Sequence, residues 1–243
     1  MLVPAECVAK VFKTTLNEFK TREKYIANDY RFKDRYKHLN PQKIVKLWAE
    51  KEMHNLMKMK RNEIRCPDVV ILKKHVLIMS FIGADNVPAP KLKDANLTSE
   101  ELKSAYDQCV QLIKDLYRKC NLVHADLNQF NLLWHESKVW VIDVSQSVEP
   151  VHPMGYEFLL RDCTNISRFF ESKHVEDVMS GEELFNLVTG QHFTGEGELF
   201  LSQIQRFYKE KRKELEGITK DENETKPYSF DYHFEKSLNK NDD

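Results

Sequence analysis

Apolar residues recur along this 243-residue chain at two different spacings, and each spacing predicts one kind of element. Short apolar runs with the character of strands lie at residues 6–14, 69–72 and 76–81. The last two runs are separated by Lys73-Lys74-His75, which predicts a hairpin. We therefore expect a small sheet in the first third of the chain.

Helical spacing of apolar residues predicts helices over the larger part of the chain. The first helix is expected to begin at Pro41, with Asn40 as its N-cap. Its apolar stripe consists of Ile44, Leu47, Trp48, Leu56 and Met59. A second helix follows the capping box formed by Thr98 and Glu101, and further helical patterns follow it.

One stretch combines two carboxylates and a carboxamide at the spacing that a metal–nucleotide site needs. It reads His124-Ala125-Asp126, then Asn131, then Asp143 at the end of a short apolar strand. In the kinase pattern, the first Asp accepts the proton of the substrate hydroxyl, and the Asn and the second Asp ligate Mg²⁺ beside the ATP phosphates. A lone Asp is mostly a solvated surface charge. The combination instead predicts phosphoryl transfer that depends on ATP and Mg²⁺.

Around these residues the chain resembles the RIO family of atypical serine/threonine kinases. The similar stretches are HADLNQFNLLWH at residues 124–135, IDVSQSVEPVHP at residues 142–153 and LLRDCTNISRFF at residues 159–170. Residues 10–20, together with Trp134-His135, resemble the third RIO subfamily in particular. The resemblance extends over about residues 6 to 190, so it does not depend on one short motif.

The resemblance implies a protein-kinase-like fold with ATP and Mg²⁺ as ligands. Asp126 would be the catalytic aspartate, Asn131 and Asp143 the metal ligands, and Lys10 the lysine that contacts the phosphates. The family also includes a phosphoaspartate at the position that matches Asp143. RIO proteins often behave as ATP-driven switches and act on precursors of the small ribosomal subunit. The resemblance thus implies a pre-40S particle or its rRNA, and a protein substrate, as partners.

The lysine and its carboxylate partner each have an alternative. Strand alternation places Lys10 and Lys13 on opposite faces, and the residues alone do not choose between them. The family pattern Lys-Val-Phe-Lys-Thr selects Lys10. Glu52 lies on the apolar stripe of the first helix, where a buried carboxylate needs a cation, and the kinase signature supplies Lys10 as that cation. Glu50 is the alternative partner but lies off the stripe, and Glu52 could also be an ordinary rim glutamate.

The second hairpin strand runs into Ile82-Gly83, where a kinase crosses from its small to its large lobe. The backbone groups expected to face adenine belong to Met79, Ser80, Phe81 and Ile82. An ordinary hairpin and linker is equally consistent with these residues.

Two departures from the expected pattern stand out. All seven glycines lie at Gly83 or later, and only nine residues precede Lys10, so we expect the strands of the glycine-rich loop to be absent. In addition, Asn128-Gln129 replaces the Ser-Glu pair that is usual in the family. A chain without the glycine-rich loop is expected to bind ATP more weakly, since backbone amides of that loop contact the phosphates.

The expected fold class is therefore α+β, a protein-kinase-like two-lobed fold with a truncated N-terminal lobe. Residues 1–82 would form the small lobe, with a charged, flexible loop at about 17–40. Residues 83–218 would form the helical large lobe, and residues 219–243 a polar, mobile tail. The competing hypothesis is a catalytically impaired kinase-like scaffold that binds RNA or protein.

Composition is consistent with a globular protein of the cytoplasm. Hydrophobic residues make up 41% of the chain and charged residues 31%. Five widely spaced cysteines without a C-x-x-C pair favour reduced thiols over disulfides or a zinc site. No apolar run approaches the roughly 18 residues of a membrane span, so no membrane partner is expected.

Net charge is −1, but the charges are distributed unevenly along the chain. Residues 1–75 hold 18 Lys and Arg against 9 Asp and Glu, whereas the remainder holds 19 against 29. Basic residues are densest at residues 20–37, where they alternate with tyrosines and a phenylalanine. This pattern is typical of an RNA-binding surface, although a solvated loop with locally packed aromatic residues has the same composition.

RNA binding through residues 20–37 gives a first prediction. Replacing Arg31, Lys33, Arg35 and Lys37 with Ser should weaken binding to structured RNA of any sequence, because phosphate contacts are lost. The slope of log affinity against log salt should fall by roughly one for each lost contact. Filter binding or fluorescence anisotropy at several salt concentrations measures both quantities. An unchanged affinity and slope would show that this region is a solvated loop.

Overall fold

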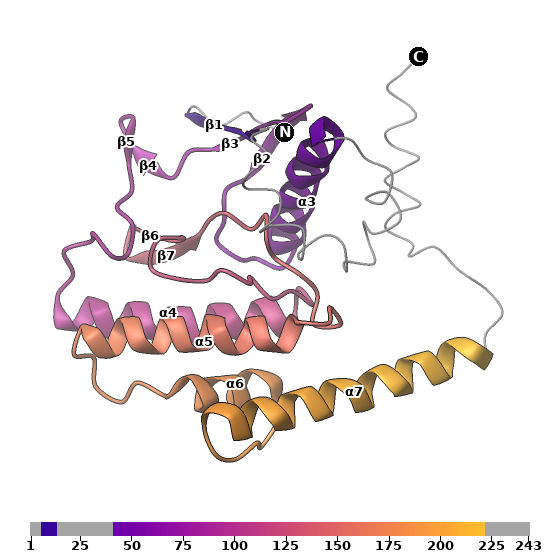
Figure 1. Ribbon diagram of the computed structural model, residues 1–243. Coiled ribbons are helices and arrows are strands. Elements are labelled where there is room, and N and C mark those ends of the chain that lie inside the picture. The colour runs from indigo at the N-terminus through magenta and orange to yellow at the C-terminus, as the bar shows by residue number, and fades with distance from the viewer. Residues whose placement is uncertain (1–5, 14–40, 222–243) are drawn as a thin grey trace. The chain divides into compact units, whose positions relative to one another are not determined.

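The computed structural model describes residues 6–13 and 41–221 (Figure 1). It divides into two compact units, Met1–Ile204 and Gln205–Asp243. The predicted RNA-binding residues 20–37, the predicted N-cap Asn40 and the end of the predicted tail lie outside the described residues. The boundaries predicted at residues 82 and 218 stay predictions.

The predicted small sheet is present in the described part of the chain. It consists of β1 (Cys7–Val11), β2 (Val69–Lys73) and β3 (Val76–Ser80), in the order β1-β3-β2 with both neighbours antiparallel. The predicted hairpin joins β2 to β3, and Lys74 in its loop has a φ of 58°. Lys10 pairs with Leu77 of β3, so both side chains lie on the same face of the sheet. Leu77 is fully buried, and this inner face therefore carries Lys10 toward the interior.

Helix α3 (Pro41–Arg61) begins at the predicted proline and contacts β2 and β3. Its apolar stripe is buried as expected, with Leu47, Leu56 and Met59 each at most 1% exposed. Glu52 lies within this stripe and is itself 1% exposed. The sequence pattern thus correctly placed a carboxylate on the buried face of the helix.

A short two-stranded ribbon, β4 (Gly83–Ala84) and β5 (Val87–Pro88), follows the small sheet and leads toward helix α4 (Ser99–Arg118). Both halves of the predicted capping box are present at the start of α4. The Thr98 side chain accepts a hydrogen bond from the Glu101 amide, and the Glu101 carboxylate accepts one from the Thr98 amide. The cap satisfies two amide groups that the first helical turn leaves without partners.

A tight hairpin, β6 (Leu132–His135) and β7 (Lys138–Val141), follows α4. Its two-residue loop consists of Glu136 and Ser137, whose φ values are 50° and 57°. Two consecutive positive φ angles are typical of a type I′ turn, whose twist matches that of paired strands. This turn fixes the register of the hairpin and therefore which residues meet at its open end.

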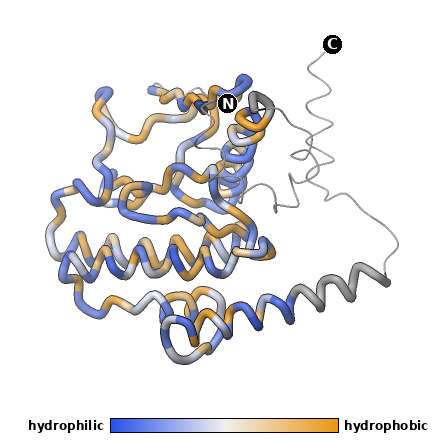
Figure 2. Tube along the Cα trace, in the orientation of Figure 1, coloured by the Kyte–Doolittle hydropathy of each residue, from blue (hydrophilic) through white to orange (hydrophobic). Residues whose placement is uncertain are grey.

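Three further helices complete the described chain: α5 (Gly155–Ser172), α6 (Gly181–Thr189) and α7 (Gly197–Asp221). Figure 1 shows α4 and α5 side by side, and α6 contacts both. Along α4 and α5, hydrophobic and hydrophilic stretches recur from turn to turn, as expected for helices with one buried face (Figure 2). Aromatic rings fill the core between them, and Tyr106 meets Phe170 edge to face at 5.4 Å.

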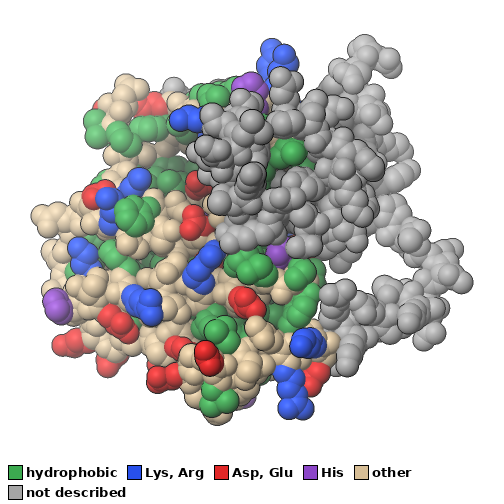
Figure 3. Space-filling view, in the orientation of Figure 1, with side chains coloured by type: hydrophobic (Ala, Val, Ile, Leu, Met, Phe, Trp, Pro, Cys, Tyr) green, Lys and Arg blue, Asp and Glu red, His purple; other side chains and the backbone are tan. Residues whose placement is uncertain are grey.

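The surface of the described residues carries mixed charges. On the face shown in Figure 3, acidic and basic side chains are interspersed between hydrophobic ones. All five cysteines are free thiols, four of them buried, in agreement with the expected absence of disulfides. None of the helices among the described residues combines the length and apolarity that crossing a bilayer requires.

The capping box of α4 gives a second prediction. Thr98→Ala should lower the free energy of unfolding by about 1 kcal/mol, because the Glu101 amide loses its acceptor. Ser99→Ala is the matched control, since Ser99 is an exposed first residue of the same helix. Urea denaturation of both variants measures the difference, and equal values would contradict a stabilising role for the cap.

Candidate functional site

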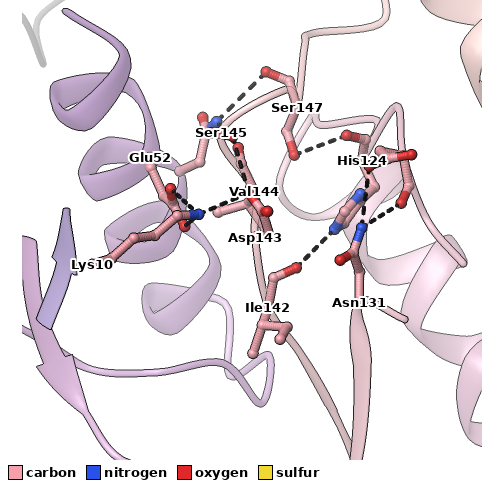
Figure 4. Close-up of polar contacts among 11 residues, drawn as sticks. Lys10, Glu52, His124, Asn131, Ile142, Asp143, Val144, Ser145 and Ser147 are labelled. Atoms are coloured by element: carbon pink, nitrogen blue, oxygen red, sulfur yellow. Dashed lines mark hydrogen bonds and ion pairs between the residues drawn. The ribbon is translucent and has the colours of Figure 1, made fainter. Parts of the chain in front are cut away.

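Three charged side chains from different parts of the chain, Lys10, Glu52 and Asp143, lie in contact, with Lys10 in the middle (Figure 4). The ammonium Nζ of Lys10 donates a hydrogen bond to Glu52 Oε1 at 2.8 Å and lies 2.7 Å from Glu52 Oε2. The same Nζ donates to Asp143 Oδ1 at 2.8 Å. Strand β1, helix α3 and the segment after β7 are therefore connected through one cation.

The pKa values around Lys10 follow from this arrangement. Burial would lower the pKa of Lys10, but the carboxylates of Glu52 and Asp143 outweigh burial and raise it above the ordinary value. Burial would likewise raise the pKa of Asp143. The ammonium of Lys10 and the hydrogen bonds from Lys10 and Ser145 outweigh that effect and lower it. Lysine and aspartate thus both remain ionised at neutral pH.

The structure distinguishes the alternatives that the sequence left open. Lys10 points into the site, whereas Lys13 is exposed beyond the end of β1. Glu52 contacts Lys10, whereas Glu50 lies 3.6 Å from Lys46 on the same helix. The predicted pair Lys10 and Glu52 is therefore present as a contact.

Asp126 is surrounded by amide donors in the loop between α4 and β6. The Asn131 Nδ2 donates to the backbone oxygen of Asp126 at 2.9 Å and to its Oδ2 at 3.2 Å. Asn128 Nδ2 donates to the same backbone oxygen at 2.9 Å and to Oδ1 at 3.3 Å. Asn128, which together with Gln129 departs from the family pattern, therefore helps Asn131 orient the carboxylate of Asp126.

The β6–β7 hairpin brings Asn131 next to the segment that contains Asp143. Leu132 pairs with Val141, and the Ile142 amide donates to the Asn131 backbone oxygen at 3.0 Å. The next residue, Asp143, has a φ of 57°, a left-handed conformation that is uncommon for a residue other than glycine. A two-residue turn, five positions after Asn131 and six before Asp143, thus brings the backbone at the two predicted metal ligands together.

Helix α5 holds the loop of Asp126, the predicted catalytic loop, through three side chains that the sequence patterns did not assign. Asp162, fully buried, accepts hydrogen bonds from the Ala125 amide at 2.8 Å and the Leu127 amide at 2.9 Å. Arg161 donates to the Ala125 carbonyl, and Asn165 donates to the Leu127 carbonyl at 3.1 Å. Both peptide groups that flank Asp126 are thereby fixed, which maintains the φ of 66° at Ala125.

The sequence contained a signal for Asp162. Asp162 lies on the buried face of a helix among Leu159, Cys163 and Ile166, where a carboxylate needs hydrogen-bond donors. Its partners are backbone amides 35 and 37 residues earlier, so the sequence gave no indication of which donors these were.

His124 links the catalytic loop to the strand that leads to Asp143. Its Nε2 lies 3.3 Å from the Ile142 carbonyl oxygen, and its own carbonyl accepts a hydrogen bond from Ser147 Oγ (Figure 4). Burial lowers the pKa of His124, so the ring is neutral at neutral pH. Its Nδ1 is buried without a hydrogen-bond partner among the described residues.

The segment predicted to face adenine lies where β3 ends, and part of its backbone is already hydrogen bonded. The Ser80 amide donates to the Asp68 carbonyl, the Phe81 amide to the Glu6 carbonyl, and the Ile82 carbonyl accepts from the Ala89 amide. Met79 belongs to β3 and is buried. A base bound here would use the other backbone groups of these residues, and the assignment stays a prediction.

The side chains near Asp143 fit Mg²⁺. Because Asn131 uses its Nδ2 toward Asp126, its amide oxygen is the atom left for a cation. Among residues 6–13 and 41–221, no three His, Cys, Asp or Glu side chains gather into a metal cluster. Mg²⁺ commonly takes only one or two protein ligands and completes its shell with phosphate and water oxygens.

The chain is similar to known proteins over most of its length. The family model of the RIO domain matches residues 3–184. Serine/threonine-protein kinase RIO3 of Homo sapiens is 59% identical over 209 residues, which cover 86% of this chain and 40% of that protein. Serine/threonine-protein kinase RIO1 of Homo sapiens is 44% identical over 206 residues, which cover 84% and 36%. The chain therefore spans well under half of the length of these relatives.

A solved structure supports the predicted fold. The crystal structure of the Rio2 kinase–ADP/Mg²⁺–phosphoaspartate complex from Chaetomium thermophilum superposes with a TM-score of 0.52 at 23% identity. The superposition covers 74% of this chain and 55% of the Rio2 chain. The α+β, protein-kinase-like fold with a reduced small lobe, predicted from the sequence, is thereby confirmed.

The burial of Asp162 gives a third prediction, on stability as a function of pH. Burial raises the pKa of Asp162 from 3.8 to about 7, against the lowering effect of the Leu127 and Ala125 amides. Between these values the folded chain keeps a proton that the unfolded chain has lost. The contribution of Asp162 to the free energy of unfolding is therefore complete below pH 3.8 and decreases by about 1.4 kcal/mol per pH unit until about pH 7.

Asp162→Asn is the matched variant because it removes the titrating group and keeps the shape. The stability difference between the unchanged chain and this variant should decrease from pH 4 to pH 7 and stay constant above pH 7. Urea denaturation across this range tests it. A difference that increases with pH would contradict the raised pKa.

Proposed function

The chain belongs to the RIO domain family, and on that premise we propose that it binds ATP with Mg²⁺ and transfers the terminal phosphoryl group. The acceptor is the hydroxyl of a protein serine or threonine, or water. The observation that carries the proposal is the position of Lys10 Nζ, 2.8 Å from Asp143 Oδ1 and held from the other side by Glu52. In the kinase pattern, the lysine–glutamate pair and the metal-binding aspartate must both be in place for phosphoryl transfer.

The ammonium of Lys10 would contact phosphate oxygens and reduce their negative charge. Glu52 keeps this cation in place without competing for the nucleotide, because its carboxylate is buried behind Lys10. Asp143 and Asn131 would hold Mg²⁺, which would supply positive charge against the negative charge that develops on the phosphate during transfer. Lys10 and the two ligands thus act on the same group of phosphate oxygens.

Asp126 would orient the acceptor hydroxyl and take its proton. Its carboxylate is fixed by the amides of Asn128 and Asn131, and its backbone by side chains of α5. A base held in place by several hydrogen bonds loses little entropy when the acceptor binds, which is how positioned groups accelerate a reaction. The arrangement supports the role of base for Asp126.

A phosphorylated aspartate is part of the proposal. The Rio2 kinase from Chaetomium thermophilum has been crystallised as a phosphoaspartate complex with ADP and Mg²⁺. In this chain we propose Asp143 for that modification, in line with the family precedent. Attack of an Asp143 carboxylate oxygen on the terminal phosphorus would release ADP, and water would then release phosphate. Such a cycle would give ATP hydrolysis without a protein substrate.

The biological setting is proposed from the family. We propose that the chain acts in the cytoplasm, in maturation of the small ribosomal subunit, with a pre-40S particle or its rRNA as partner. The excess of basic residues in the first third of the sequence supports an RNA partner. A protein substrate is a further partner if transfer to serine or threonine is the main activity.

Substitution of the two aspartates gives a fourth prediction. Asp143→Ala should remove Mg²⁺-dependent binding of ATP and leave the fold intact, because it deletes a metal ligand on the surface of the site. Asp126→Ala should spare binding and lower turnover by at least about 10²-fold, the low end for a positioned acid or base. Calorimetry with ATP, with and without Mg²⁺, and phosphate release measure the two effects.

Two outcomes would reject the proposal or narrow it. Unchanged affinity and turnover in Asp143→Ala would contradict the assignment of the site. Mg²⁺-dependent binding without turnover in the unchanged chain would instead favour the competing hypothesis of a catalytically impaired scaffold.

A further inference from the structure

A fully buried asparagine on α3 contacts the segment that follows Asp143. Asn55 Nδ2 donates to the Val144 carbonyl at 2.8 Å and lies 3.5 Å from the Ser147 carbonyl. Val144 is the residue directly after Asp143, and its side chain is also fully buried. The turn that presents Asp143 is therefore anchored at its next residue by both side chain and backbone.

The chemistry of a carboxamide suits this position. Its amino group has two protons and can serve two carbonyl oxygens at once. A buried amide that found no such acceptors would be unfavourable, and leucine of similar size would fill the same space with apolar atoms. The presence of asparagine is explained by the two carbonyls, Val144 and Ser147, that it reaches.

Asn55 is one of three polar residues at three-residue spacing along α3. Glu52 holds Lys10, Asn55 holds the Val144 carbonyl, and Lys58 Nζ lies 3.2 Å from Glu149 Oε1. Residues three apart lie on one face of a helix. A single face of α3 thus contacts the cation of the site and, three and six residues further along, the segment that follows Asp143.

The conformation of Asp143 needs such an anchor. Its φ of 57° is sparsely populated for a residue with a β-carbon and persists only where the surroundings fix it. Two contacts act on its carboxylate, since Lys10 and Ser145 both donate to Oδ1. Among the side-chain hydrogen bonds of the described residues, only that of Asn55 acts on the backbone directly after Asp143.

We propose that Asn55 is a positioning residue, which holds the Asp143 turn so that the carboxylate faces Mg²⁺. This inference rests on the proposed function. It adds that α3 positions both Lys10 and Asp143, because a movement of α3 that withdrew Glu52 from Lys10 would also withdraw Asn55 from Val144. The positions of Lys10 and Asp143 therefore both depend on the position of α3.

Two variants of the full chain test the role in metal binding. Asn55→Leu keeps the volume and removes both donors, and Asn55→Asp keeps the shape and places carboxylate oxygens against carbonyl oxygens. Asn62→Ala is the matched control, because Asn62 lies in the turn directly after the same helix and its side chain donates to the Lys58 carbonyl at 2.9 Å. Melting temperatures establish that each variant is folded.

The main measurement is a calorimetric titration of MgCl₂ at a fixed concentration of ADP. In Asn55→Leu the Mg²⁺ concentration for half-maximal binding should rise about tenfold, which corresponds to 1.4 kcal/mol. Binding of ADP without Mg²⁺ should stay the same, because Lys10 and Glu52 are unchanged. Asn62→Ala should differ from the unchanged chain by less than about twofold. A purely structural role would weaken binding equally with and without the metal.

Hydrogen exchange of the nucleotide-free chain gives a measurement that does not depend on activity. The Ser147 amide donates to the Val144 carbonyl, so its exchange should accelerate in Asn55→Leu and not in Asn62→Ala. Unchanged exchange would overturn the anchor itself. Faster exchange with an unchanged Mg²⁺ requirement would overturn the positioning role and leave the proposed function standing. Absence of Mg²⁺-dependent binding in the unchanged chain would overturn the proposed function, and this inference with it.

Discussion

The ion pairs of Lys10 connect parts of the chain that otherwise belong to separate elements. One ammonium on β1 meets a buried carboxylate from α3 and a more exposed carboxylate that follows β7. A buried carboxylate such as Glu52 would be strongly unfavourable without a cation. The position of β1 against α3 is therefore determined by charge as well as by apolar packing. Removal of Lys10 would take the ammonium away from the buried carboxylate of Glu52.

The remainder of the site depends on backbone conformations that other elements maintain. Ala125, which precedes the predicted catalytic residue Asp126, and Asp143, a predicted metal ligand, both have positive φ angles. The first is held by α5 through Arg161 and Asp162, and the second by α3 through Asn55. Strained backbone at functional positions persists because surrounding structure fixes it. Helices distant in sequence thus provide the geometry that the catalytic motif requires.

Much of this site could be predicted from short-range patterns, and the rest depended on long-range contacts. The spacing from Asp126 to Asn131 and Asp143 predicted a metal–nucleotide site, and the apolar stripe of α3 correctly indicated that Glu52 is buried. Strand alternation alone did not distinguish Lys10 from Lys13, and only the family resemblance did so. The contacts of Asp162 and Asn55 join residues 35 to 92 positions apart, and no local pattern specifies such partners.

The most direct test of this account compares two lysine variants of the full chain. Lys10→Met keeps most of the aliphatic stem and removes the ammonium between Glu52 and Asp143, whereas Lys13→Met removes an exposed charge three residues away. Calorimetry with ATP in the presence of Mg²⁺ should show at least about tenfold weaker binding for Lys10→Met, the loss expected for a hydrogen bond to a charged group. Lys13→Met should bind within about twofold of the unchanged chain. Equal affinities for the two variants would contradict the claim that Lys10 organises the site.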